Sequence, residues 1–309
     1  MPSSLLSSFV LAVGLAAATA CGASSTAPAE AAPAEAAADD APVARPARIV
    51  ALGGPVTETL FALGAGSRVV GVDLSSLHPE AATRLPRVGY YRQFSAEGVL
   101  SLRPDVVIAS DQAGPPAALE HLRASGVPVL EIPAADDLND ARANLEAIAA
   151  AAGVDAAEAL RLRARLERDL EGAQTLLRRA RSRPRVLFVY ARGPGRLLVG
   201  GRGTPMAELI ALAGADNAGA AIEGMRPWSA EAVIDAAPEI VLLPSRGLDS
   251  VGGEAGLLAL PGLAQTPAGR ERRIVAIDDL KLLGFGPRIG EGLRELVVGL
   301  HPEVAEGPT

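Results

Sequence analysis

The sequence predicts an α/β protein made of two Rossmann-like lobes with parallel sheets, joined by one long bridging α-helix. Residues 95–109, SAEGVLSLRPDVVIA, return as residues 229–243, SAEAVIDAAPEIVLL, with six of fifteen positions identical. Short apolar runs of the strand type alternate with helical patterns around each copy, which is typical of parallel sheets covered by helices. Between the copies lies a long amphipathic segment, residues 155–182. The repeat and this segment together indicate two related lobes connected by a helix.

The first lobe is expected to span residues 48–154. It begins with the apolar run Arg48-Ile-Val-Ala-Leu, which Gly53-Gly54-Pro55 ends, and a helix follows with Thr57 as its N-cap. Further strands are expected at residues 69–72, 106–109 and 129–132, with a helix at 117–124.

The second lobe, residues 183–309, is expected to repeat this scheme. The segments LFALGAG (60–66) and LIALAGA (209–215) extend the similarity between the lobes beyond the main repeat. Strands are expected at residues 186–190, 240–243 and 274–277, and a helix at 204–212.

Residues 155–182 are expected to form the bridging helix. The segment has no proline and one glycine, and its leucines lie among many charges, so it predicts an amphipathic helix of about 28 residues, roughly 40 Å long. The leucines do not keep a heptad spacing for long enough to form a coiled-coil seam. Because a single long helix is a stiff connection, we expect only a small closure motion between the lobes.

The N-terminal residues 1–21 have the pattern of an export signal peptide. An apolar run that begins at Leu11 is too short to cross a bilayer, and small residues follow it up to Cys21, the only cysteine. The sequence Ala18-Thr19-Ala20-Cys21 is similar to the lipobox of bacterial lipoproteins, in which the cysteine is acylated. Cleavage near Ala20 by the ordinary signal peptidase is the alternative.

Residues 22–47 are expected to form a disordered tether. They consist mainly of Ala, Pro, Ser, Asp and Glu without an aromatic residue, a composition that buries too little apolar surface to offset the entropy of ordering. Of the formal charge of −7, −3 belongs to this segment, which leaves −4 for residues 48–309. A mildly acidic body argues against nucleic acid as a partner. Contact with a membrane is expected only through a lipid anchor.

Two short segments concentrate the aromatic residues of the chain. GYYRQF (89–94) and GMRPW (224–228) lie just before the two copies of the repeat and carry Arg92 and Arg226 at equivalent positions. Four of the nine aromatic residues lie here: Tyr90, Tyr91, Phe94 and Trp228. Two matched loops of this kind are what a ligand cleft between lobes requires, and ordinary core packing is the alternative reading of the aromatic residues.

The order of leader, tether, lobe, long helix and lobe, together with GYxR-x-x-SAEGVLSLRPD, resembles the periplasmic haemin-binding proteins of bacterial ABC importers. The resemblance covers residues 48–300 and includes the stretches GTPMAELIALAG (203–214), GMRPWSAEAVI (224–234) and LLGFGPR (282–288). It implies haem b, as ferric protoporphyrin IX, for the transported ligand, an ABC permease dimer as the partner, and a monomer in the periplasm or at the outer face of the cytoplasmic membrane.

In the family that this chain resembles, the tyrosine after the glycine of the GYxR motif supplies a phenolate to the haem iron. That residue is Tyr90 here, with Tyr91 as the alternative ligand. A free phenol has a pKa of about 10, so a phenolate at neutral pH needs the stabilisation that ferric iron and a nearby guanidinium provide. The resemblance therefore assigns Arg92 to the phenolate oxygen or to a haem propionate.

The second lobe is expected to contribute three residues to the cleft. Arg226 has a guanidinium suited to a propionate carboxylate, Met225 is expected to pack on the porphyrin or ligate weakly, and Trp228 is expected to stack on the ligand or fill the core. Among the histidines, His78 is interpreted as a loop residue that could reach the cleft mouth as a second ligand, whereas His121 and His301 are not expected to be functional.

Glu97 and Glu231 occupy the same place in the repeat, each directly after Ser-Ala at the start of a predicted helix. One interpretation is a helix N-terminal carboxylate, favoured by the helix dipole. The resemblance implies another role, because one glutamate on each lobe of these proteins engages arginines of the permease. The two roles are compatible.

Other function classes have weaker support in the sequence. A ferric-siderophore or cobalamin carrier would share the architecture, so the fold alone does not decide the ligand. A metal-ion carrier needs clustered His, Asp and Glu, and the three histidines are scattered. The sequence has no GxSxG elbow, HExxH helix or GxxxxGK[ST] loop, so an enzyme is not expected.

Overall fold

The structure of the chain, a computed structural model, describes residues 45–193, 197–227 and 229–305. These residues belong to one compact unit. The predicted leader, its Cys21, the tether up to residue 44 and Trp228 lie outside the described residues. Within the part of the chain that is described, no helix is both long enough and apolar enough to span a membrane.

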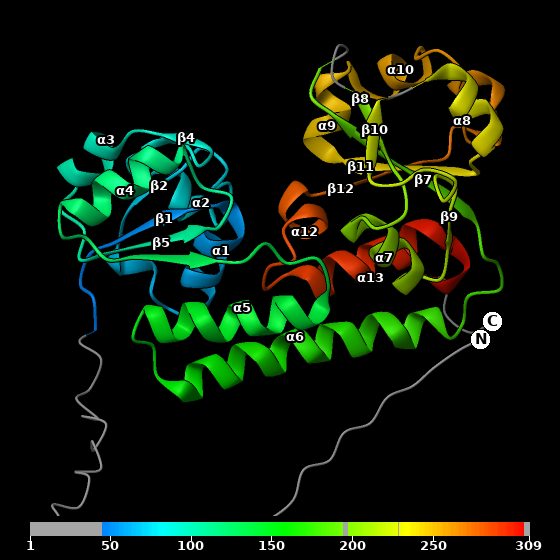
Figure 1. Ribbon diagram of the computed structural model, residues 1–309. Helices are drawn as coiled ribbons and strands as arrows, with labels where there is room; N and C mark the ends of the chain where they lie inside the picture. The colour runs from blue at the N-terminus through cyan, green and yellow to red at the C-terminus, as the bar shows by residue number, and fades with distance from the viewer. Residues whose placement is uncertain (1–44, 194–196, 228, 306–309) are drawn as a thin grey trace, which may run out of the picture. The chain divides into compact units, whose positions relative to one another are not determined.

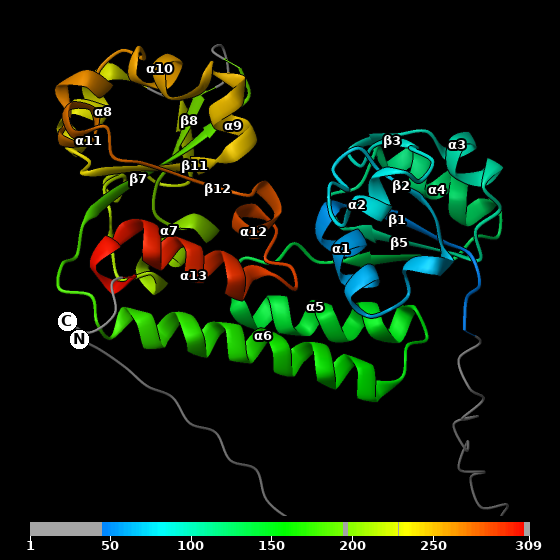
Figure 2. The ribbon, with the colours of Figure 1, turned by 180° about the vertical axis from the view of Figure 1, so that it is seen from behind.

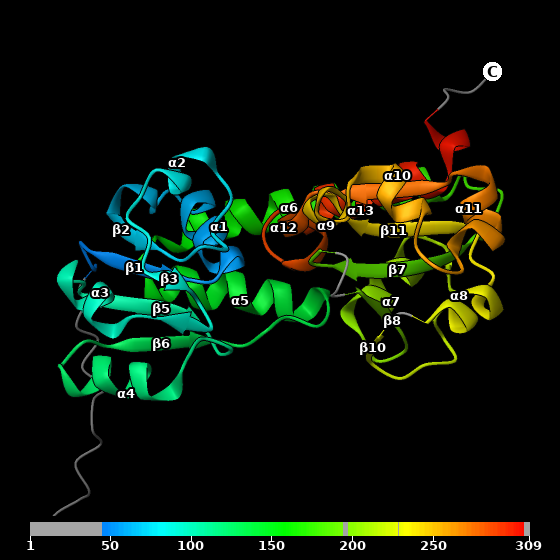
Figure 3. The ribbon, with the colours of Figure 1, turned by 90° about the horizontal axis from the view of Figure 1, so that it is seen from above.

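The N-terminal lobe contains a parallel sheet of four strands in the order β2-β1-β5-β6, seen edge to edge in Figure 3. The strands are β1 (Ile49–Leu52), β2 (Val69–Val72), β5 (Val106–Ser110) and β6 (Val129–Ile132), within one residue of the predicted bounds. A two-stranded antiparallel hairpin, β3 (Gly89–Tyr90) with β4 (Gln93–Phe94), lies beside this sheet in sequence and space.

Side chains of β1 alternate between two hydrophobic clusters. Ile49 and Ala51 pack in one cluster, and Val50 and Leu52 in the other, all of them fully buried. A sheet covered on both faces requires an unbroken apolar strand, which explains why this run has no polar alternation. The helices of this lobe are α1 (Gly54–Ala62), α2 (Glu80–Thr83), α3 (Ala96–Ser101) and α4 (Pro116–Ala124), with a 3₁₀ turn at Gly66–Arg68.

Thr57 is not the N-cap that the sequence suggested. Helix α1 begins at Gly54, three residues earlier, with Gly53 in the cap position and Pro55 in the first turn. Proline is favoured there because its missing N–H is one that the first turn leaves unpaired. Thr57 is fully buried inside the helix, and its Oγ1 lies 2.7 Å from Ser76 Oγ.

The bridging helix is α6, Ala156–Leu177, whose 22 residues extend about 33 Å. Its N-cap is Asp155, which accepts a hydrogen bond from Ala157 N at 2.7 Å. It packs against α5 (Leu138–Ala151) and α13 (Ile289–Leu300), as Figures 1 and 2 show from opposite sides. The helix ends five residues before the predicted residue 182. Its last turn tightens there, because Arg179 N and Ala180 N bond to the carbonyls of Leu176 and Leu177, three residues back, and the α-helical pattern stops.

The C-terminal lobe contains a mixed sheet in the order β10-β8-β7-β11-β12, with β9 also paired to β7. The prediction of an α/β fold with two lobes and a bridging helix is confirmed, but this sheet is not wholly parallel. Strand β8 runs antiparallel to both β7 and β10, whereas β7, β9, β11 and β12 pair in parallel. The strands are β7 (Arg185–Ala191), β8 (Leu197–Gly200), β9 (Asp216–Asn217), β10 (Met225–Pro227), β11 (Ile240–Pro244) and β12 (Ile274–Ile277).

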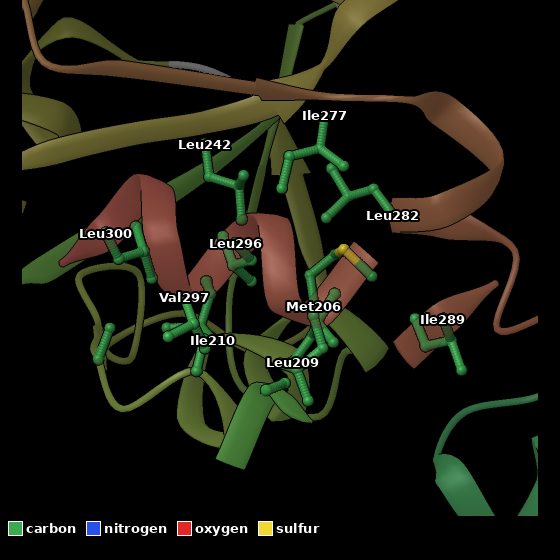
Figure 4. Close-up of a cluster of buried hydrophobic side chains, with 14 of the residues drawn as sticks. Met206, Leu209, Ile210, Leu242, Ile277, Leu282, Ile289, Leu296, Val297 and Leu300 are labelled. Atoms are coloured by element: carbon green, nitrogen blue, oxygen red, sulfur yellow. The ribbon is translucent and has the colours of Figure 1, made fainter. Parts of the chain in front are cut away.

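Helices cover this sheet on the face where the largest buried cluster lies. Figure 4 shows Leu242 and Ile277 from the sheet opposite Leu296 of α13 and Leu209 of α7. The helices of the lobe are α7 (Pro205–Leu212), α8 (Ala230–Ala236), α9 (Ser245–Ser250), α10 (Gly253–Leu258), α11 (Pro267–Glu271), α12 (Asp279–Leu283) and α13, with 3₁₀ turns at Leu263–Gln265 and Pro302–Val304.

The two copies of the sequence repeat fold alike. Each begins with a serine N-cap, continues as a short helix (α3 or α8) and ends in a central strand (β5 or β11). Arg103 and Ala237, which are equivalent in the repeat, both adopt left-handed backbone, with φ of 47° and 43°. The repeat therefore encodes one local structure twice, including a backbone conformation that non-glycine residues rarely adopt.

Candidate functional site

A cavity of about 590 Å³ is lined by residues of both lobes. This volume lies within the range of about 300–1,000 Å³ that small-molecule sites occupy. Its floor is apolar and includes Ala141, Leu145 and Ile148 of α5. Polar side chains and aromatic rings come mainly from strand ends and from the loops after them, so the cavity combines an apolar part with a few polar groups.

The lining residues follow the carboxyl ends of parallel strands. In the N-terminal lobe, Gly53 follows β1, Leu74 follows β2 and Gln112 follows β5. In the C-terminal lobe, Arg246 follows β11 and Asp279 follows β12. In open α/β sheets, ligands bind outside the carboxyl ends of the strands, and here two such edges contribute to one cavity.

Tyr90 and Tyr91 project from the β3-β4 hairpin and line the cavity. Their ring centroids are 4.7 Å apart with an interplanar angle of 65°, an edge-to-face contact. Tyr90 is 41% exposed, whereas Tyr91 is partly buried and packs against the hydrophobic cluster of its lobe. The structure therefore brings both predicted phenols to the cavity and leaves Tyr90 the more accessible.

Arg92 holds the hydroxyl of Tyr91. Its Nε donates to Tyr91 Oη at 2.9 Å, and its Nη2 donates to Oε1 of Gln112, which also lines the cavity. Burial, reinforced by a hydrogen bond with Tyr90, raises the pKa of Tyr91 to about 12 against the opposing effect of Arg92. At neutral pH, Tyr91 is therefore a neutral phenol that can donate a hydrogen bond.

Tyr190, Arg192 and Asp279 form a polar group on the opposite wall. The Arg192 guanidinium lies 4.6 Å from the centroid of the Tyr190 ring, and its Nη1 is 3.5 Å from Asp279 Oδ2. Asp279, which is 6% exposed, also accepts from Arg246 N at 3.0 Å through Oδ1. The carboxylate thus holds Arg192 and the backbone of Arg246 at the cavity wall.

Sequence reasoning missed this second group, although two signals for it were present. Tyr190-Ala191-Arg192 repeats the Tyr-x-Arg spacing of Tyr90-Tyr91-Arg92. Arg246 and Asp279 follow the predicted strands 240–243 and 274–277 by three and two residues, the positions where a parallel sheet presents side chains to a ligand.

The predicted residues of the 224–228 loop lie elsewhere or outside the described residues. Met225 and Arg226 are part of β10, where they pair with Gly200 and Val199 of β8, and neither lines the cavity. Met225 is partly buried against the core of its lobe, while Arg226 is exposed. Nothing in the structure describes Trp228.

The histidines lie outside the cavity lining. His78 is half-buried in the loop after β2, and burial, followed by the charge of Arg288, lowers its pKa. His121 is exposed, with Nδ1 4.0 Å from Glu97 Oε1, and His301 is fully buried with Nε2 2.9 Å from Ala213 O. Among the described residues, no three His, Cys, Asp or Glu side chains gather as a metal-binding cluster would require.

Glu97 and Glu231 are both exposed in the first turn of their helices, α3 and α8. The N-cap hydroxyl of Ser95 accepts from Gly98 N at 3.1 Å, and that of Ser229 accepts from Ala232 N at 3.4 Å. Hydrogen bonds from backbone N–H and from Ser95 lower the pKa of Glu97, so its carboxylate is ionised at neutral pH.

A model of the periplasmic binding protein family matches residues 49–280, which include both sheets and the bridging helix. This chain belongs to the periplasmic binding protein family. The match begins at the first residue of β1 and ends inside α12, so it includes all the strand ends that line the cavity.

Solved structures of this family include haem-binding proteins. The periplasmic haem-binding protein RhuT of Roseiflexus sp. RS-1 is 45% identical, with 84% of this chain and 99% of that chain covered and a TM-score of 0.79. A periplasmic haem-binding protein of Pseudomonas aeruginosa is 38% identical, with coverage of 83% and 93% and a TM-score of 0.74.

Curated relatives are more distant. The ABC transporter substrate-binding lipoprotein YvrC of Bacillus subtilis is 26% identical over 261 residues, 84% of this chain and 81% of YvrC. A vitamin B12-binding protein of Yersinia pestis is 27% identical over 204 residues, 63% of this chain and 69% of that protein.

Proposed function

We propose that this protein binds ferric haem outside the cytoplasm and delivers it to the permease of an ABC importer. The observation that carries the proposal is the pair of phenols, Tyr90 and Tyr91, beside a guanidinium at the edge of a cavity with an apolar floor. Similarity to a solved haem-binding protein at 45% identity supports the same ligand. A porphyrin suits such a cavity because it is a flat apolar body with two carboxylates at one edge.

Tyr90 is the proposed ligand of the iron. It is the more exposed of the two phenols, and it lies within hydrogen-bond reach of both Tyr91 and Arg92. Tyr91 retains its proton, because its pKa is about 12, and can donate to a phenolate on Tyr90. Arg92 donates to the Tyr91 oxygen in turn, which makes Tyr91 a stronger donor. An anionic oxygen ligand favours ferric over ferrous iron.

The haem propionates are proposed to bind the opposite wall. Arg192 and Arg246 both line the cavity. The Asp279 carboxylate pairs with the guanidinium of Arg192 and accepts a hydrogen bond from the backbone N–H of Arg246. A guanidinium binds a carboxylate with two parallel hydrogen bonds. An ion pair on an exposed surface adds little binding energy, so arginines in the cavity wall suit the propionates better. Arg226, the propionate ligand expected from the sequence, lies outside the lining residues, so these two arginines are favoured over it.

Glu97 and Glu231 are the proposed contacts with the permease. Both are exposed first-turn carboxylates at equivalent positions of the two lobes. A pair of this kind suits a permease built from two equivalent subunits that present basic side chains. The leader and Cys21 are proposed to export the chain and to anchor it through a lipid, which agrees with the lipoprotein name of YvrC.

Titration of the purified protein with ferric haem tests the ligand assignment. We expect saturable binding, and we expect Tyr90→Phe to change the absorption spectrum and to raise the Kd more than about tenfold, because the ring remains while the ligand oxygen is lost. Tyr91→Phe is the matched control: it keeps the ligand oxygen and removes only a hydrogen bond to it, so its complex should keep the absorption bands of a tyrosine ligand, with a smaller shift and a smaller loss of affinity than in Tyr90→Phe.

The outcomes separate the alternatives. An unchanged spectrum and affinity in Tyr90→Phe, with a changed spectrum in Tyr91→Phe, would transfer the ligand role to Tyr91. Saturable binding of cobalamin without binding of haem would replace the proposed function by the one that the vitamin B12-binding relative carries.

A further inference from the structure

Asp73 is a fully buried carboxylate that lies behind the cavity wall and does not line it. It follows β2 directly, between Val72 and the cavity residue Leu74. Its oxygens accept four hydrogen bonds from neutral groups: Gly53 N at 2.9 Å, Ser76 Oγ at 2.9 Å, Ser75 N at 2.7 Å and Tyr91 N at 3.3 Å. The Arg87 guanidinium lies nearby and donates to the backbone oxygen of Asp73 at 2.8 Å. A buried carboxylate is costly to keep unless its oxygens are hydrogen-bonded.

Three of these donors belong to three different segments of the cavity wall. Gly53 lies in the turn from β1 to α1, Ser75 lies in the loop after β2, and Tyr91 follows the first strand of the hairpin. Gly53 has a φ of 121°, a conformation reserved for glycine, and its N–H points at the carboxylate. One side chain therefore ties three lining segments together.

The hairpin has few other attachments. Each of its strands has two residues. Backbone bonds hold it to its surroundings: Leu74 N donates to Gly89 O at 2.8 Å, Gly114 N to Tyr91 O at 2.9 Å and Phe94 N to Gly114 O at 3.1 Å. The side chain of Arg92 adds a bond to Gln112. Tyr91 is thus fixed on one side of its peptide by Gly114 and on the other by Asp73. Since the Tyr90 and Tyr91 rings are in contact, a shift of the Tyr91 backbone moves both phenols.

We propose that Asp73 is a positioning residue that sets where the Tyr90 and Tyr91 hydroxyls lie in the cavity, and thereby the geometry of the iron ligand. The identity of the ligand, ferric haem, rests on the proposed function. The role of Asp73 rests on the hydrogen bonds that its carboxylate accepts behind the cavity wall. Groups that orient a ligand residue change affinity about 10–100-fold when they are removed, although they touch neither metal nor substrate.

The test compares Asp73→Asn with Ser76→Ala. Asparagine keeps the shape of the side chain but replaces one accepting oxygen by an NH₂ group, which cannot accept. The variant therefore loses either the bond from Gly53 N at Oδ1 or the bonds from Ser75 N and Tyr91 N at Oδ2, and in each case a lining segment is released. Ser76→Ala removes the hydroxyl donor of the same carboxylate but leaves the backbone N–H bonds from Gly53, Ser75 and Tyr91 in place. We expect Asp73→Asn to raise the Kd for ferric haem about tenfold or more and to shift its spectrum, and Ser76→Ala to leave both unchanged.

Amide hydrogen exchange of the apo protein provides a readout that needs no haem. Exchange at residues 89–94 should be faster in Asp73→Asn than in the wild type and in Ser76→Ala.

If neither the wild type nor the variants bind haem while this exchange pattern holds, the proposed function fails and the positioning role of Asp73 stands. Wild-type spectrum, affinity and exchange in a folded Asp73→Asn protein overturn the role of Asp73. Should Asp73→Asn fail to fold, Asp73→Ser, which leaves room for water to accept the freed N–H groups, is judged by the same criteria.

Discussion

At the scale of single residues, an ion pair between Glu58 and Arg288 joins the first helix of the N-terminal lobe to the N-cap of α13. The Glu58 side chain is 2% exposed and that of Arg288 is 15% exposed, so the pair is nearly removed from water. The second carboxylate oxygen of Glu58, Oε2, is buried without a hydrogen bond within the described residues. Burial therefore raises the pKa of Glu58 to about 7, although Arg288 acts in the opposite direction.

This pKa predicts that Glu58 makes stability depend on pH. An unfolded glutamate loses its proton near its ordinary value of 4.5, while the folded protein keeps it up to about 7. Between pH 4.5 and about pH 7 the folded state binds more protons than the unfolded state. The contribution of Glu58 to the free energy of unfolding is therefore fully present below pH 4.5 and is lost as the pH rises through about 7. The loss amounts to about 3 kcal/mol at about 1.4 kcal/mol per unit.

Denaturant unfolding of the wild type and of Glu58→Gln between pH 4 and 8 measures this difference. The stability of the wild type relative to the variant should fall as the pH rises. Glu97→Gln is the contrasting control, because the pKa of Glu97 is lowered and its contribution is lost at acid pH instead. A difference between wild type and Glu58→Gln that stays constant or grows with pH would contradict the burial argument.

At the scale of elements, the contact between α6 and α13 depends on a close approach of two helices. A Cβ added at Gly290 of α13 would lie 2.7 Å from Asp169 Cβ and 3.1 Å from Leu170 N of α6. Side chains of α6 at Leu166 and Leu170 are buried in the same cluster as those of α13. The bridging helix is therefore held along the C-terminal lobe by backbone proximity as well as by apolar burial.

Gly290→Ala should lower the free energy of unfolding by about 1–3 kcal/mol, because the helices must separate to admit the methyl group. Gly172→Ala is the matched control: Gly172 lies within α6, and an added Cβ there meets no atom within 4 Å. That change should instead stabilise the protein by about 0.5–1 kcal/mol through helix propensity. Unfolding in denaturant distinguishes the two, and equal effects of both changes would refute the close-approach argument.

The repeat also explains why the elements of the two lobes were predictable. Arg48 bonds to the carbonyls of Leu102 and Arg103 through its guanidinium, and Arg185 bonds to that of Ala236, which is equivalent to Leu102. Arg48 directly precedes β1 and Arg185 is the first residue of β7, and each of these strands lies beside the repeated one, so the pattern of the repeat includes the neighbouring strand. The apolar runs agree with the observed strand bounds to within about one residue.

At the scale of the whole molecule, the sequence predicted two lobes and a bridging helix, and it predicted the phenols of one wall. It did not predict Tyr190 and Arg192, because Tyr190 lies near the end of a strand whose central residues are buried core, and Arg192 directly follows that strand. Nor did it predict the antiparallel β8, since strand direction depends on which edge a short connection reaches and not on the composition of the strand. The role of Asp73 is likewise invisible in sequence, because its partners are backbone N–H groups from separate loops.

The proposed delivery of the ligand to a permease is the property that needs both lobes at once. Glu97 and Glu231 are exposed, ionisable and equivalent in the two copies of the repeat, and neither lines the cavity. Replacing both by arginine should abolish haem uptake into vesicles that carry the cognate permease, because like charges would then face its basic residues. Haem binding should be retained, since the changes lie away from the lining residues.

A matched variant separates docking from helix capping. Glu80 and Glu254 are also exposed first-turn glutamates, one in each lobe, so their replacement by arginine removes the same favourable interaction with a helix dipole. That variant should transport haem at the wild-type rate. Normal transport by Glu97→Arg/Glu231→Arg would show that the two repeated carboxylates serve only their own helices. Loss of transport in both double variants would instead assign the effect to net charge, because each raises the charge of the protein by the same amount.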